Sequence, residues 1–140
     1  MTNTTNHWLG VVSRSHVERG VAGGFAQLCH GKEQPLRRMQ VGDWLIYYSP
    51  SSEMRGGQRL QAFTALGQVE DDRVFPFDMG GGFVPYRRKI RYQRVQPVPL
   101  ARLADRLHLT ASPNWGMALR RGHLGLDRHD FELIAGEMRG

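Results

Sequence analysis

Most of the regular pattern along the chain is typical of short β-strands. An apolar run over residues 7–13 predicts a first strand, and residues 44–49 predict a second one that is buried on both faces. Residues 59–70 form a longer candidate, in which Gly67 indicates a bend because glycine inside a strand often marks a bulge. In residues 85–95, alternate side chains should fall on opposite faces of a further strand. The chain is therefore expected to fold around a β-sheet.

Helical signals are shorter and lie between the strands. A Ser-x-x-Glu capping pattern predicts one or two turns over residues 15–19, ended by the glycines that follow, and residues 35–39 predict one more turn. Leucines three and four residues apart predict an amphipathic helix over residues 100–107. Asp127 is placed to cap a last helix that extends to Met138. The core-facing side of that helix consists of Phe131, Ile134, Ala135 and Met138.

The remaining segments are irregular or rich in glycine, at residues 23–32, 51–57, 71–82 and 112–124. Strands do not alternate with long helices, which argues against a parallel sheet of βαβ units. We therefore predict an α+β fold with a mixed, mostly antiparallel sheet, curled toward a barrel and flanked by short helices. No repeat or linker divides the chain, so residues 7–140 are expected to form a single domain after a flexible polar lead-in, residues 1–6.

Composition adds a strongly basic balance. The 140 residues carry a formal net charge of +6, and Lys32 and Lys89 are the only lysines, so arginine supplies nearly all of the positive charge. Arginine pairs with phosphate through a planar fork and stacks on bases, which makes nucleic acid a reasonable partner. The alternative is a basic protein without such a partner, and charge alone does not separate the two.

Cysteine usage and hydropathy bear on the location of the protein. A lone thiol at Cys29 argues against a disulfide framework and favours a reducing compartment. No stretch approaches the roughly 18 apolar residues that span a bilayer. Residues 1–7 also lack the apolar segment of a signal peptide. We therefore expect a cytoplasmic monomer that does not bind membranes.

Motifs for catalysis, metals and cofactors are weak. A Cys–His pair can generate a nucleophilic thiolate, but Cys29 and His30 are adjacent, so their side chains would point apart on an extended chain. The imidazole would have to come from His16 or His123. The histidines show no zinc spacing, and the glycines at residues 80–82 lack the lysine of a phosphate-binding loop. We predict no enzyme activity, no metal and no cofactor, with a Cys-dependent enzyme as the weaker alternative.

Several stretches resemble the EVE domain, a PUA-like module related to the YTH reader domain. The most specific of them is the block GDWLIYYSP. The stretches occur in the order expected for that family, at residues 8–13, 24–27, 42–50, 85–88 and 115–121. The chain is similar to the bacterial stand-alone branch, in which the loop with Cys29, His30 and Gly31 replaces the Arg/Asn-containing loop of eukaryotic members.

The resemblance implies a PUA-like curled β-barrel and a non-catalytic reader of a modified nucleobase in RNA or DNA. The base would lie in a pocket with aromatic walls. Because the loop over residues 23–32 differs from that of eukaryotic members, the ligand stays open between a free nucleobase, a nucleotide in RNA and a small metabolite. A small-molecule-sensing or protein-interaction module with the same pocket is the alternative function, and salt dependence of binding would separate the two.

A flipped base needs an apolar slot, stacking side chains and a few polar groups at its edge. Phe25 and Trp115 are the candidate walls, because both lie in glycine-flanked irregular segments where binding sites often gather. The polar candidates are Ser13, Gln27 and Tyr47, joined by His30, Lys32, Arg120 and Arg121. Tyr47 and Tyr48 point to opposite faces of their strand, so only one of them can face a pocket. A structural role in the core or in a turn is the alternative for each of these residues.

The densest basic stretch lies within residues 85–95. Its candidate nucleic-acid surface consists of Arg87, Arg88, Lys89 and Arg91. Arg87, Lys89 and Arg91 share one strand face at intervals of about 7 Å, since a strand rises about 3.3 Å per residue. This spacing roughly matches a phosphate backbone. A charged, solvated face that protects an edge strand is the alternative.

Overall fold

The computed structural model describes residues 5–140. Within this range the strands are β1 (His7–Val11), β2 (Phe25–Ala26), β3 (Trp44–Ser51), β4 (Arg59–Pro76), β5 (Tyr86–Tyr92), β6 (Val98–Pro99) and β7 (His123–Leu126). The helices are α1 (Arg14–Gly23), α2 (Glu33–Arg38), α3 (Leu100–Leu103), α4 (Trp115–Leu119) and α5 (Arg128–Arg139), with 3₁₀ turns η1 (Cys29–Gly31) and η2 (Leu109–Ala111). Residues 1–4 of the predicted lead-in lie outside the described residues.

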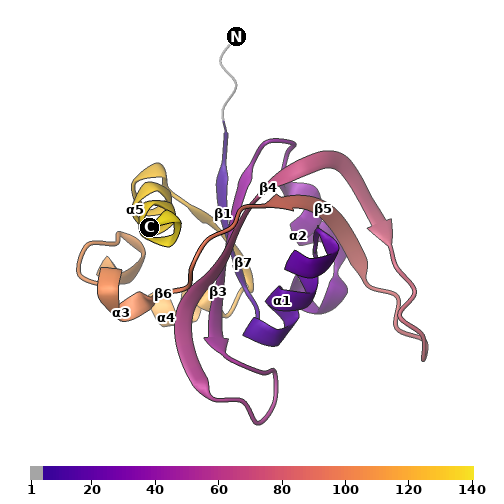
Figure 1. The fold of residues 1–140 in the computed structure, drawn as a ribbon, viewed down its shortest axis with the longest axis horizontal. Helices are drawn as coiled ribbons and strands as arrows, with labels where there is room; N and C mark the ends of the chain where they lie inside the picture. The colour runs from indigo at the N-terminus through magenta and orange to yellow at the C-terminus, as the bar shows by residue number, and fades with distance from the viewer. Residues whose placement is uncertain (1–4) are drawn as a thin grey trace.

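The strands of the described range form one sheet in the order β2-β5-β4-β3-β1-β7, with β6 paired to β4. Only β1 and β3 pair in parallel, and α1 and α2 lie in the crossover that such a pair requires. Figure 1 shows β4 bending over α1 and α2. The predicted α+β, mostly antiparallel fold is confirmed. The sheet curls without closing into a barrel, however, because β2 and β7 remain its two edges.

Helices cover both faces of the sheet (Figure 1). α3 and α5 contribute to one hydrophobic core, and α1 and α2 contribute to the other. β3 lies between the two cores: Ile46 and Tyr48 belong to the first, whereas Leu45 and Tyr47 belong to the second. This placement explains the continuous apolar run of β3, because both faces of the strand are covered. The prediction of a strand buried on both faces is confirmed.

The C-terminal helix forms as the sequence predicts. The side chain of Asp127 accepts a hydrogen bond from the backbone N–H of Asp130 over 2.8 Å and caps α5. Such a cap satisfies one of the N–H groups that lack a partner at a helix start. All members of the predicted core face are buried: Phe131, Ile134, Ala135 and Met138.

The first helix is longer than predicted and begins differently. α1 starts after Ser13, and no side chain caps it, so the expected capping box does not form. Gly20 lies inside the helix because a Cβ there would be 2.7 Å from the carbonyl oxygen of Phe25. The helix ends at Gly24, whose φ of 71° is the left-handed conformation that glycine adopts without strain. Close packing, rather than chain breaking, therefore explains the glycine within the helix.

Three other predicted boundaries are wrong. β4 continues to Pro76, six residues beyond its expected end, because its distal part pairs with β5 after a register shift between Val69 and Val74. α3 has only four residues, and the segment predicted as irregular at residues 112–124 contains α4 and the start of β7. In the described part of the chain, no helix combines the length and the apolar character needed to cross a bilayer.

Asp43 ties the start of the chain to the turn before β3. It is 1% exposed and accepts hydrogen bonds from the backbone N–H groups of Asn6 and Gln40 at 3.1 and 2.8 Å. Its second oxygen also accepts the indole N–H of Trp8 at 2.9 Å. The block GDWLIYYSP thus combines this buried carboxylate with the central strand that both cores share.

Candidate functional site

A cavity of about 860 Å³ opens between segments that are far apart in the sequence. Its walls come from the end of β1, from α1, from the stretch between β2 and α2, and from the β3–β4 connection. The loop between β4 and β5 and the turn between α4 and β7 complete it. This size falls in the range of about 300–1,000 Å³ that is usual for small-molecule and cofactor sites.

Left-handed backbone shapes the segment that leads from β2 to α2. Cys29, His30 and Gly31 have consecutive φ values of 49°, 60° and 84°. A Cβ at Gly31 would overlap Pro85, so only glycine fits there. The left-handed conformation at the two other residues costs on the order of 1–3 kcal/mol each and is common at binding sites. All three residues line the cavity.

Arg87 reaches the cavity from β5, clamped between two aromatic rings. Its guanidinium carbon lies 3.8 Å from the ring centroid of Phe25 and 3.8 Å from that of Phe77. Its Nε donates a hydrogen bond to Oε1 of Gln27 over 3.1 Å. Stacking against both rings and the bond to Gln27 therefore hold the guanidinium plane in one orientation.

Among residues 5–140, the lining is positively charged and contains no carboxylate. Its five cationic residues are Arg19, Lys32, Arg87, Arg120 and Arg121. None of these forms an ion pair with another residue in the 5–140 range. Burial, reinforced by Arg19, lowers the pKa of His16 below 6.5, so this lining histidine is neutral at pH 7. The cavity therefore favours ligands that carry negative charge.

Most residues predicted for the ligand site line this one cavity: Ser13, Phe25, Gln27, His30, Lys32, Arg120 and Arg121. Tyr47 and Trp115 do not. Tyr47 is 1% exposed in the second core, stacks on Tyr92, and has its pKa raised by burial to about 12. Trp115 is half-buried and packs against the first core. The structure therefore places Trp115 outside this cavity, and Tyr48 also belongs to the first core.

Other lining residues were not predicted from the sequence: His16, Arg19, Met54, Met79, Phe83 and Leu119. Met79 and Phe83 flank the glycines of the β4–β5 loop and are 49% and 46% exposed. The loop folds back on itself, since the N–H of Met79 donates to the carbonyl of Phe83 at 3.0 Å. Large apolar side chains beside a run of glycines were the one local signal that could have identified this wall.

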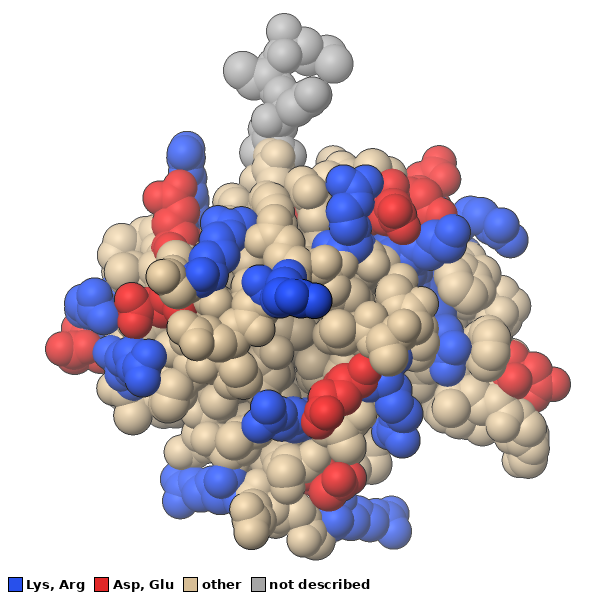
Figure 2. Space-filling view, in the orientation of Figure 1, with Lys and Arg blue, Asp and Glu red and all other residues tan. Residues whose placement is uncertain are grey.

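The predicted basic surface on β5 divides into three environments. Arg87 lies in the cavity, whereas Lys89 and Arg91 are exposed. Arg88 is 3% exposed, so its prediction as a surface residue is wrong. Its guanidinium donates to main-chain carbonyls of α2 and β4 instead. Figure 2 shows Lys and Arg interspersed with Asp and Glu over the visible face, rather than gathered in a single basic stripe.

Cys29 lines the cavity but is not arranged as a nucleophile. Burial raises the pKa of its thiol, an effect that Lys32 and Arg38 only partly oppose. Its Sγ lies 3.5 Å from the carbonyl oxygen of Arg121, a contact in which the thiol is the donor. A catalytic cysteine needs a depressed pKa and a base within reach. These surroundings favour the protonated, unreactive thiol.

We therefore expect Cys29 to react with an aromatic disulfide reagent several times more slowly in the folded protein than in urea-unfolded protein at the same pH. A raised pKa lowers the thiolate fraction, and burial limits access of the reagent. Release of the coloured thiol measures both rates. Faster reaction in the folded protein would indicate an activated thiolate and contradict this assignment.

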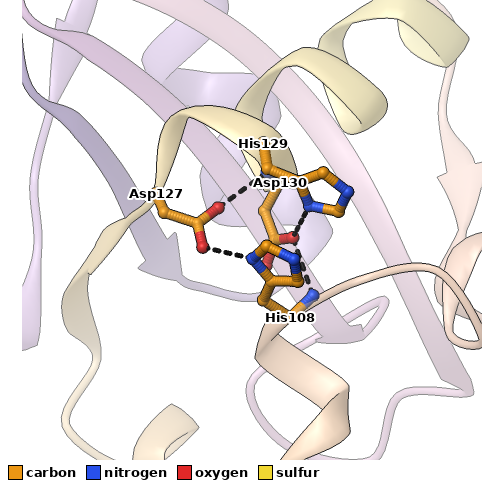
Figure 3. Close-up of side chains that lie close together, drawn as sticks. All are labelled: His108, Asp127, His129 and Asp130. Carbon is orange, nitrogen blue, oxygen red and sulfur yellow. Dashed lines mark hydrogen bonds and ion pairs between the residues drawn. The ribbon is translucent and has the colours of Figure 1, made fainter.

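A cluster of two histidines and two aspartates lies away from the cavity, at the start of α5 (Figure 3). Each carboxylate oxygen is already engaged. Asp127 bonds the N–H of Asp130 and, at 2.7 Å, Nδ1 of His108; this bond raises the pKa of His108. Asp130 accepts the backbone N–H groups of His108 and Leu109, both at 2.8 Å. The cluster therefore fastens the turn at residues 108–109 to the start of α5.

A second cavity, of about 900 Å³, lies beside β1 and α5. It is lined by aromatic residues that include Trp8, Trp44 and Phe131, and by one charge of each sign, Arg128 and Glu132. None of the residues predicted for the ligand site lies in it. The cavity of 860 Å³ is therefore the stronger candidate for a functional site.

Comparisons with solved structures agree with the fold. The YTH domain of Zygosaccharomyces rouxii MRB1, solved in complex with N6-methyladenosine RNA, superposes with a TM-score of 0.67 at 12% identity, covering 99% of this chain and 87% of that one. A hypothetical protein from Leishmania major gives a TM-score of 0.63 at 10% identity, covering 95% and 94%. At such low identity these likenesses establish a shared fold.

Sequence comparisons identify the family. A UPF0310 protein of Streptococcus mutans is 48% identical over 136 residues, covering 94% of this chain and 96% of that protein. The UPF0310 protein YdcG of Bacillus subtilis is 44% identical over 135 residues, covering 96% and 92%. The family model of the EVE domain matches residues 6–137. The chain therefore belongs to the EVE domain family.

Proposed function

We propose that this protein binds nucleic acid without catalysis and holds one base, which can be a modified base, in the cavity of 860 Å³. The observation that carries the proposal is the lining of that cavity, which supplies five cations and no carboxylate around apolar walls. The likeness to a YTH domain solved with N6-methyladenosine RNA supports the same ligand class.

The lining offers the groups that a base requires. Phe83 and Met79 give the cavity an exposed apolar wall, while one face of Phe25 is covered by Arg87. We therefore assign base stacking to Phe83. The hydroxyl of Ser13 and the amide of Gln27 are the groups that would meet the edge of the base.

In this proposal, the cations at the cavity contact the phosphate groups of the nucleic-acid backbone. Arg120, Arg121 and Lys32 are exposed residues of the lining and would contact phosphates. Lys89 and Arg91 are exposed on β5 and would extend the contact outside the cavity. Phosphate contacts release counterions, so binding should weaken steeply as salt rises.

The Phe83→Ala variant is expected to bind a short oligonucleotide about five- to 150-fold more weakly, because base stacking on an aromatic ring is worth about 1–3 kcal/mol. Val84→Ala is the matched control, since Val84 is 48% exposed in the same loop but does not line the cavity. Fluorescence anisotropy measures both affinities, with DNA and RNA oligonucleotides that contain unmodified or methylated bases.

Each titration is repeated at low and high salt. Equal binding by the two variants would contradict the assignment of Phe83. Binding that is insensitive to salt and limited to uncharged small molecules would instead support a small-molecule sensor.

A further inference from the structure

Arg87 is the buried member of the five cations that line the cavity. It is 9% exposed, and no acidic side chain in residues 5–140 lies within ion-pair distance of it. A buried charge is costly unless it is paired or fully hydrogen-bonded. Arg88 meets this requirement through main-chain carbonyls. Arg87 has one neutral partner in the described part of the chain, the amide oxygen of Gln27.

The contacts of Arg87 leave the two terminal amino groups of its guanidinium available to a ligand. The rings of Phe25 and Phe77 both lie 3.8 Å from the guanidinium carbon, and Gln27 accepts the hydrogen bond of Nε. The two terminal amino groups remain, and they are the groups that donate in parallel to the two oxygens of a phosphate or a carboxylate. Because the plane is already fixed, little rotamer freedom is lost when such a group binds.

We propose that Arg87 is the anchor of an oxyanion site within the cavity. The inference rests on the proposed function and narrows it: the ligand presents a phosphate or carboxylate group to Arg87. A nucleotide that keeps its phosphate and a base that carries a carboxylate share this chemistry. A neutral nucleoside lacks it and binds much more weakly.

A purely structural arginine would give a different result. In that case Arg87 would only join Phe25 of β2 to Phe77 of the β4–β5 loop. Its loss would loosen the loop without changing the preference among ligands. The preference for an anionic ligand over its neutral counterpart therefore separates the two roles.

The test is isothermal titration calorimetry at constant ionic strength, adjusted with chloride. The probes are inorganic phosphate, the common nucleosides, their 5′- and 3′-monophosphates, and the pair orotate and uracil. Orotate is a pyrimidine with a carboxylate, and uracil is its neutral counterpart. The proteins are the wild type, Arg87→Met, Arg87→Lys and the control Arg73→Met, which removes an exposed arginine of β4 outside the cavity.

We expect at least one anionic probe to bind the wild type about tenfold or more tightly than its neutral counterpart, as a charge-assisted pair requires. Arg87→Met should abolish this preference, Arg87→Lys should reduce it, and Arg73→Met should keep it. Preference for a monophosphate identifies a phosphate ligand, and preference for orotate identifies a base carboxylate. If Arg87→Met does not fold, Arg87→Lys still separates the roles, because it keeps the charge and loses the fork.

Two results would overturn the oxyanion site: neutral probes that bind as tightly as anionic ones, or a preference that both Arg87 variants retain. Salt-dependent oligonucleotide binding that requires Phe83 would then leave the proposed function standing. Conversely, mononucleotides that bind through Arg87 while oligonucleotides do not would support the site and remove the nucleic-acid function.

Discussion

The Arg88→Met variant is expected to lose at least about 3 kcal/mol of its free energy of unfolding, because several buried main-chain carbonyls lose their donor together. Nη1 of Arg88 donates to the carbonyl of Leu36 at 2.7 Å and to that of Met39. Nε and Nη2 both donate to the carbonyl of Asp71, at 3.1 and 2.9 Å. Methionine preserves the apolar stem of the side chain and removes every one of these donors.

The position of these carbonyls explains the size of the effect. Leu36 lies in the last turn of α2, and its carbonyl also accepts the backbone N–H of Met39 at 3.4 Å; Met39 follows the end of the helix, where carbonyl groups lack an intrahelical partner. Asp71 lies in β4 where the pairing with β5 is interrupted between Val69 and Val74. Arg88 therefore donates hydrogen bonds both to carbonyls at the end of a helix and to a carbonyl at an irregular part of a strand. Each carbonyl left without a donor costs about 1–3 kcal/mol, a large share of a total stability near 5–15 kcal/mol.

Urea unfolding followed by tryptophan fluorescence measures the loss. Arg91→Met is the matched control, because Arg91 is exposed on the same strand and its contact with Glu70 is long, at 3.9 Å. We expect the control to stay within about 0.5 kcal/mol of the wild type. An unchanged unfolding midpoint for Arg88→Met would show that water replaces the guanidinium at no cost.

Arg88 also shows what the sequence could and could not predict on β5. Alternation correctly placed Arg88 on the face of Ile90, and Ile90 is buried in the second core. Residue type alone indicated a solvated arginine. The burial of Arg88 depends on the carbonyls of Leu36 and Asp71, which accept its hydrogen bonds. These residues lie in other segments, so no local pattern reveals them. The four basic residues of this strand therefore looked equivalent but occupy different environments.

Some residues of the candidate site could likewise be predicted from the sequence, and others could not. Ser13 was predicted because it ends the first strand, and Gln27 because its amide can pair with the edge of a base; both line the cavity. The prediction that Tyr47 faces the pocket did not anticipate its burial in the second core, because the residue type alone does not show what a strand face packs against. Phe83 was missed because its place in the lining depends on how the β4–β5 loop packs beside Gly31 of η1. Long-range geometry, rather than composition, decides these positions.

His123 provides the second large effect, a loss of stability in mild acid. This residue is 2% exposed, it stacks on Trp8 with 4.7 Å between ring centroids, and neither ring nitrogen has a hydrogen-bond partner among the described residues. Burial, with Arg38 nearby, lowers the pKa of His123 to about 4. The folded protein therefore keeps this imidazole neutral at a pH where an exposed one is charged.

The sign of the pH dependence follows from the two pKa values. Above pH 6.5 the imidazole is neutral in both states and has no effect on stability. Below that pH the unfolded chain takes up a proton and the folded protein does not, so stability falls until about pH 4. The shift corresponds to a loss of about 3 kcal/mol across this window. His7 and His16, whose pKa values burial also lowers, add to the same slope.

The His123→Phe variant isolates the contribution of this one residue. Phenylalanine keeps the ring stacked on Trp8 and cannot bind a proton, so its stability should fall about 3 kcal/mol less than that of the wild type between pH 6.5 and pH 4. His123→Leu serves as a second variant if the larger ring does not fit.

Urea unfolding at a series of pH values gives the difference in stability between each variant and the wild type. For the His123 variants, that difference should grow steadily as the pH falls below 6.5 and level off near pH 4. A constant difference for His123→Phe and His123→Leu would mean that water or a neighbouring group stabilises the charged imidazole in the folded protein. The neutral imidazole of His123 stacked on Trp8 would then not be the source of the acid sensitivity.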